Sequence, residues 1–167
     1  MITHMKSYPL PDAVALSSFE VGLIRTSFRA VEHQSGLASQ RFYRELFSYD
    51  PALRNLFAPD PWTREDQLMN TIGDIVEQLD STDAVSAHLR QLVQRFPAYA
   101  LNRYYHLYVG AALFAMLEDI LGAKFSSEVY GAWYKLFQRA VVEVKSQAQE
   151  NGPTKLTARP FAHPTAA

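Results

Sequence analysis

The chain of 167 residues contains no cysteine. It therefore cannot form disulfides, thiolate metal sites, a cysteine nucleophile or a thioether bond to a pigment. Glycine is scarce, with seven residues, and no glycine-rich phosphate-binding loop is present. Neither a Ser-His-Asp pattern nor a paired-carboxylate motif occurs, so the sequence predicts a protein that is not an enzyme.

An excess of charge of one sign is also lacking. The chain contains sixteen Lys and Arg and seventeen Asp and Glu, which gives a formal net charge of −1. Because there is no excess of basic residues, we expect no nucleic-acid partner. The longest apolar run, Tyr108–Leu117, is too short to span a bilayer. The first twelve residues contain no apolar run of signal-peptide length. We therefore expect a cytoplasmic protein without a membrane partner.

Apolar residues recur at helical spacing, and no segment alternates as a strand does, which predicts an all-α fold of about seven helices around a buried pocket. One domain is predicted over residues 17–149, between a leader over 1–16 and a disordered tail over 150–167. The helices are expected from Ser17 to a break at Ser35-Gly36, then over 37–49, from Asp50-Pro51 to about 57, and over 63–79, 85–96, 101–121 and 126–149.

Capping residues mark several of these helix ends. Ser17-x-x-Glu20 is a capping box, Ser126 is an N-cap, and Gly122 suits a C-terminal cap. The last two helices are long and joined by a short turn, so we expect them to pack antiparallel. The inward faces are predicted to include Phe19 and Phe28 in the first helix, Phe42, Tyr43, Leu46 and Phe47 in the second, and Trp133 in the last.

Taken in order, several short motifs resemble the globin domain of bacterial single-domain globins and flavohaemoglobins. The resemblance covers about residues 17–144, and it implies a haem cofactor and the handling of oxygen or another diatomic ligand. The motifs are Phe42-Tyr43-Arg44-Glu45-Leu46-Phe47, Asp50-Pro51-Ala52-Leu53-Arg54, Leu56-Phe57, Tyr108-Val109-Gly110-Ala111-Ala112-Leu113, Leu121-Gly122, Phe125-Ser126-Ser127-Glu128-Val129 and Ala132-Trp133.

The same resemblance assigns site residues, and some of them depart from the family pattern. Tyr43 matches the distal tyrosine that hydrogen-bonds an iron-bound oxygen, and Phe57 matches the corner phenylalanine that stacks on the haem. Arg64 stands where a distal glutamine or histidine is usual, and its permanent charge prevents it from binding iron. Phe96 stands at the position of the proximal histidine and has no lone pair for iron. His106 replaces a tyrosine on the proximal side.

Three other residues, His88, Tyr99 and His106, are candidates for a replacement iron ligand. His88 lies eight residues before Phe96, about 12 Å along a helix, which is too far without rebuilding the helix. Tyr99 follows Phe96 by three residues, and phenolate ligation of haem exists, but Pro97 leaves its direction open. His106 is interpreted first as a core histidine, then as a proximal hydrogen-bonding group, and last as a shifted ligand.

Two functional hypotheses follow. In the first, the protein is a globin that binds haem weakly and handles a diatomic ligand. In the second, the fold has lost haem and is a sensor or protein-interaction module that responds to an apolar ligand, an anion near Arg64, a protein partner or a second copy. The segment after the last predicted helix is too short for a reductase domain, so we expect no dioxygenase activity.

Overall fold

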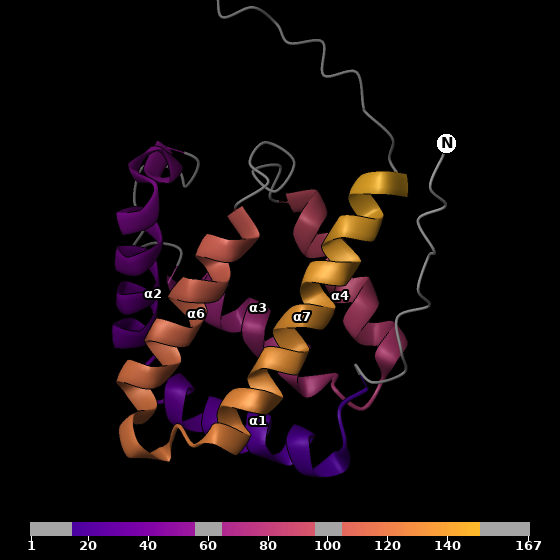
Figure 1. The fold of residues 1–167 in the computed structure, drawn as a ribbon, viewed down its shortest axis with the longest axis horizontal. Coiled ribbons are helices and arrows are strands. Elements are labelled where there is room, and N and C mark those ends of the chain that lie inside the picture. The colour runs from indigo at the N-terminus through magenta and orange to yellow at the C-terminus, as the bar shows by residue number, and fades with distance from the viewer. Residues whose placement is uncertain (1–14, 56–64, 96–104, 151–167) are drawn as a thin grey trace, which may run out of the picture.

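The computed structural model describes residues 15–55, 65–95 and 105–150 (Figure 1). These residues form no strand, so the all-α prediction is confirmed. They contain six α-helices and two short 3-10 helices: α1 (Ser18–Glu32), α2 (Ser35–Tyr49), η2 (Pro51–Asn55), α3 (Glu65–Glu77), α4 (Thr82–Arg95), α6 (Tyr105–Leu121), η4 (Gly122–Lys124) and α7 (Ser127–Glu150).

The helix ends confirm the predicted caps. The Ser17 hydroxyl accepts from the Glu20 amide at 3.2 Å, and the Glu20 carboxylate accepts from the Ser17 amide at 2.9 Å. Gly122, at the end of α6, has a φ of 53°, a conformation that strains residues with a Cβ. The Ser126 hydroxyl accepts from the amide of Val129 at 3.3 Å and caps α7.

Some predicted boundaries shift. The break between the first two helices lies at His33 and Gln34, because α2 already begins at Ser35. The Ala38 amide donates to the Gln34 carbonyl at 2.9 Å, so the predicted break at Ser35-Gly36 instead forms the first turn of α2. The predicted starts at residues 63 and 101, the end near 57, and nearly all of the leader and tail lie outside the described residues.

The helices α6 and α7 run in opposite directions on one side of the molecule, as predicted, while α1 crosses the base and α2 packs along α6 (Figure 1). The rings of Phe114 and Phe137 meet edge to face at 6.1 Å between α6 and α7. Gly110 makes room for this contact, because a Cβ at that position would lie 2.7 Å from the Phe137 ring.

The core contains most of the predicted inward residues. Phe42, Tyr43, Leu46 and Phe47 of α2 are all buried, as are Phe28 of α1 and Trp133 of α7. The prediction for Phe19 was wrong, because its side chain is 64% exposed. Phe19 is the second residue of α1, and it lies beside the capping box at the helix start.

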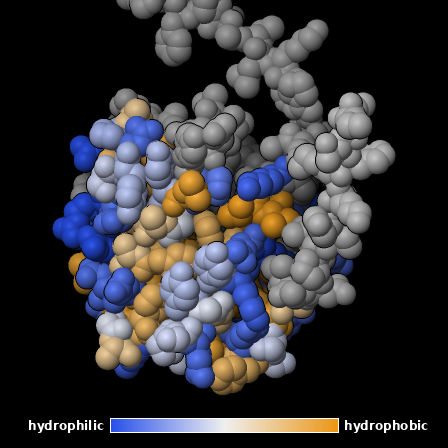
Figure 2. All heavy atoms as spheres, in the orientation of Figure 1, coloured by the Kyte–Doolittle hydropathy of each residue, from blue (hydrophilic) through white to orange (hydrophobic). Residues whose placement is uncertain are grey.

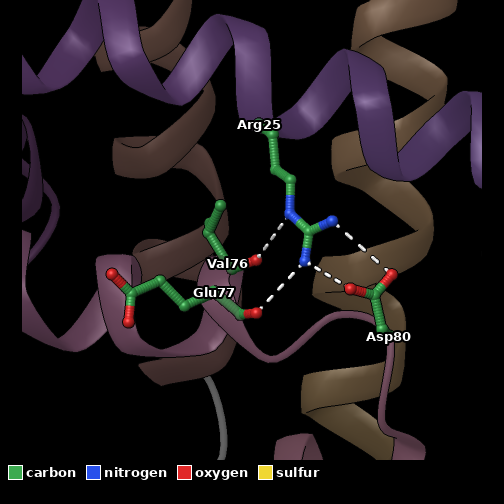
Figure 3. A network of polar contacts seen from close by, with 4 residues as sticks. All are labelled: Arg25, Val76, Glu77 and Asp80. Atoms are coloured by element: carbon green, nitrogen blue, oxygen red, sulfur yellow. Dashed lines mark hydrogen bonds and ion pairs between the residues drawn. The ribbon is translucent and has the colours of Figure 1, made fainter.

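Polar contacts join α1 to distant parts of the chain. The buried Trp133 Nε1 donates to the Ser27 hydroxyl at 2.9 Å, which links α7 to α1. Arg25 of α1 donates to the carbonyls of Val76 and Glu77 at 3.4 and 3.1 Å and forms an ion pair with Asp80 at 2.9 Å (Figure 3). Its cation thus binds the free carbonyls at the C-terminal end of α3, where the helix dipole favours positive charge.

Candidate functional site

Tyr43, on α2, lies in the protein core among aromatic side chains. Its side chain is 7% exposed. The ring meets Phe42 edge to face at 5.3 Å and an interplanar angle of 82°, and it stacks on Phe47 at 5.8 Å and 24°. Phe47 follows Tyr43 by one helical turn, so both rings project from the same side of α2. The helix therefore presents an aromatic wall to the interior.

The C-terminal end of α2 and the start of α6 are joined by a second aromatic contact. Tyr49 and Tyr108 stack with centroids 5.6 Å apart and planes within 5° of parallel. The Tyr49 hydroxyl donates to the Glu45 carboxylate at 3.1 Å, and this bond raises the pKa of Tyr49 above its usual value. No pattern in the sequence predicted this contact between Tyr49 and Tyr108.

His106 is the second residue of α6 and is partly exposed. It lies on the same helix as Tyr108, at the end of the molecule where α2 and α4 finish and α6 begins (Figure 1). The remaining predicted site residues, Phe57, Arg64 and Phe96, lie outside the described residues, as does Tyr99. The roles assigned to all five site residues remain predictions.

His88 is partly exposed on α4, as expected for a histidine outside the pocket. Its Nε2 lies 3.8 Å from the Asp74 carboxylate of α3, and the side chain is 29% exposed. The neighbouring group is therefore a carboxylate of α3. The position on α4 does not favour His88 as a replacement iron ligand.

The described part of the site supplies buried aromatic surface around Tyr43. Phe42, Tyr43 and Phe47 form a wall suited to a flat apolar ring, since aromatic faces and edges pack well against such groups. No group of three or more His, Asp or Glu within 15–55, 65–95 and 105–150 could hold a metal ion. Tyr43 and His106 are the predicted pocket residues in these ranges that carry a lone pair suited to iron.

No family model matches the sequence. Individual proteins do match it. The chain is 26% identical to a flavohemoprotein of Halalkalibacterium halodurans over 125 residues, which are 71% of this chain and 30% of that protein. It is 25% identical to the neuroglobin of Danio rerio over 154 residues, which are 84% of this chain and 97% of that protein. A flavohemoprotein of Bacillus cereus is 20% identical over 84% of this chain and 36% of its own length.

The two kinds of relative differ in how much of their length is matched. This chain spans about a third of the flavohemoproteins, whereas it spans nearly the whole neuroglobin. The matched length agrees with the extent of the motifs quoted above, and the all-helical architecture agrees with a globin-like fold. These similarities, at 20–26% identity, support a relationship to the globin family.

Proposed function

We propose that the protein is a globin-like haem protein that handles a diatomic ligand through an atypical and weakened haem site. The observation that carries the proposal is the match to a neuroglobin along 97% of that protein's length. Flavohemoproteins, whose name states a haem, match the same region of the chain. The buried aromatic wall around Tyr43 is compatible with a bound porphyrin.

The weakened site follows from the residue at the proximal position. Phe96 stands thirteen residues before Val109, where the family resemblance places histidine. Without that bond, affinity would come chiefly from apolar contact with the ring, at roughly 25 cal/mol for each Å² buried. Tyr43, Tyr99 and His106 are the candidate replacement ligands, and haem held this way is expected to leave the protein easily.

A titration of the purified protein with haemin tests the proposal. We expect a sharp Soret band that saturates at one haem per chain. A broad band that never saturates, like that of free haemin, would contradict haem binding. It would favour the second function, a haem-free globin fold that acts as a sensor or interaction module, for which Phe96 at the proximal position is the supporting observation.

Two substitutions at one position test the assignment of the proximal site. Phe96→His adds a lone pair, so we expect stronger haem retention on gel filtration and the spectrum of histidine-ligated haem. Phe96→Leu is the matched control, because leucine is apolar and cannot bind iron. If Phe96→His behaves as Phe96→Leu does, Phe96 is not at the proximal position.

A further inference from the structure

A groove of about 540 Å³ lies at the surface between the second half of α6 and the start of α7. Its volume falls within the ~300–1,000 Å³ of sites that hold small molecules. Figure 2 shows apolar residues gathered over α6 on the side turned to the viewer. Helical spacing places four lining residues on one face of α6: Ala111, Phe114, Ala115 and Glu118. The two alanines are small and leave room beside the aromatic rings of Phe125 and Tyr130, which also line the groove.

The three aromatic rings that line this groove are inclined to one another. The ring of Tyr130 lies 5.0 Å from that of Phe114, with 45° between the planes, and 6.0 Å from that of Phe125, with 71°. Tyr134, outside the groove, stacks on Tyr130 at 5.9 Å and helps to hold it in place. The face of an aromatic ring carries negative partial charge. Inclined rings around one space form the kind of cage that recognises quaternary ammonium groups.

Glu118 adds a carboxylate to the same groove. Its side chain is exposed, and it forms no ion pair or hydrogen bond within residues 15–55, 65–95 and 105–150. Its neighbour Asp119, by contrast, pairs with Arg41 at 3.2 Å. Glu118 lies in the last turn of α6, which contains no basic residue, although the helix dipole favours a cation at this end. The groove therefore combines an unpaired negative charge with the negative end of a helix, and no basic side chain is among the described residues that line it.

The polar groups of the groove select among cations. A metal ion needs several oxygen ligands, whereas Glu118 is the one carboxylate among the described lining residues. Ammonium and guanidinium groups carry several N–H donors, each of which needs an acceptor. The Ser126 hydroxyl in the lining already accepts from the Val129 amide at 3.3 Å. A quaternary ammonium group has no N–H donor, so that one carboxylate and aromatic surface suffice to bind it.

We propose that this groove binds a small organic cation of the quaternary ammonium class. Glu118 balances its charge, and its methyl groups pack against the rings of Phe125 and Tyr130. The proposal does not depend on haem. Glu118 lies twelve residues along α6 from His106, which is about 18 Å at ~1.5 Å per residue.

A titration with choline tests the proposal. The matched neutral probe is the tert-butyl analogue of choline, in which carbon replaces the charged nitrogen. Heteronuclear NMR of the labelled chain follows the amides of Ser127 and Tyr130, which line the groove. We expect choline to shift both amides saturably and the neutral analogue to bind ~10-fold more weakly, because attraction to the rings and to Glu118 requires the charge. Equal affinity for the two probes, or no saturable shift with choline, would overturn the proposal.

Two pairs of substitutions test the residues of the groove. Glu118→Gln should weaken choline binding ~10-fold. Glu128→Gln removes the same charge from an exposed residue of α7 outside the groove and should leave binding unchanged. Tyr130→Leu should weaken binding ~5-fold, whereas Tyr134→Leu, which removes a ring outside the groove, should have a smaller effect. Equal effects within either pair, with helical circular dichroism unchanged, would show that the groove is not the binding site.

Phosphatidylcholine vesicles carry the same ammonium group and distinguish a lipid headgroup from a free molecule. Residues 106–124 have a mean hydropathy of 1.3 and by length and composition could cross a membrane, a test that a core helix also passes. Choline binding without co-sedimentation of the chain with vesicles supports a free molecule. Co-sedimentation that Glu118→Gln abolishes supports the same site with a lipid headgroup. Co-sedimentation that Glu118→Gln leaves unchanged, without choline binding, would overturn the proposal, because apolar contact alone would then hold the chain to the bilayer.

Discussion

The α1 end of the molecule and the region around Tyr43 are held by different kinds of contact. At the α1 end, side chains far apart in sequence form directional polar contacts. Three of them tie α1 to α7 and to the turn after α3: Ser27–Trp133, Glu20–Lys135 and Arg25–Asp80. Each requires a particular distance and angle between donor and acceptor. The packing of α1 against α7 and against the turn after α3 therefore depends on the geometry of these polar contacts as well as on the burial of apolar side chains.

Around Tyr43, aromatic rings contact one another. Phe42 and Phe47 flank Tyr43 on α2, and Tyr49 stacks on Tyr108 of α6. The ion pair of Arg41 with Asp119 adds a polar link between the same two helices. Aromatic and aliphatic packing tolerates changes of shape when volume is kept.

The largest effect is expected for Trp133→Ala at the α1 end. Trp133 is 2% exposed and donates a buried hydrogen bond to Ser27. Removal of a buried tryptophan leaves a cavity, and we expect a loss of ~3–5 kcal/mol in the free energy of unfolding. Urea denaturation followed by circular dichroism measures the change. A loss below 1 kcal/mol would show that α1 and α7 are not held together by this contact.

A second pair of substitutions compares the two regions directly. Ser27→Ala removes the hydroxyl oxygen and leaves the buried indole N–H of Trp133 without its acceptor, at a cost of ~1–3 kcal/mol. Leu46→Met alters a fully buried side chain on α2, beside Phe47 in sequence, yet keeps its volume and should cost less than ~1.5 kcal/mol. Urea midpoints of both variants measure the difference. If Leu46→Met costs more than Ser27→Ala, the contrast between the two regions is wrong.

Local signals in the sequence were sufficient for much of the fold. The capping box at Ser17, the glycine at 122 and the cap at Ser126 act within a few residues, and each appears in the structure as predicted. Phe19 shows the limit of periodicity, because helical spacing cannot tell whether a neighbour covers the first turn. The Ser27–Trp133 bond joins residues 106 positions apart, and no local pattern predicts such a pairing.

The sequence predicted less of the candidate site than of the fold. Tyr43 was correctly placed in the interior, because helical spacing locates it among apolar residues on the inner side of α2. Its assigned role comes from the resemblance to globins and cannot be derived from spacing. The stack of Tyr49 on Tyr108 was missed, since it depends on how the end of α2 meets the start of α6. Phe57, Arg64 and Phe96 stay predictions.

The smallest expected effect concerns Glu20 and acid. A hydrogen bond from Lys135, with further bonds from Ser17, lowers the pKa of Glu20 below its usual 4.5. A lowered pKa in the folded state means that the ionised carboxylate stabilises the fold. This stability is present above pH 4.5 and is lost as the pH falls through the lower folded value.

Glu20→Gln isolates this contribution, because glutamine still serves in a capping box but carries no charge. At pH 7 we expect the variant to lose ~0.2–1 kcal/mol, the usual range for a partly exposed ion pair. The difference between the two proteins should shrink as the pH falls below 4.5, since protonated Glu20 is also uncharged. Urea midpoints measured from pH 7 to pH 3 test this, with Glu32→Gln on the exposed side of α1 as the control. A difference that stays constant with pH would mean that the ion pair with Lys135 does not hold α7 against α1.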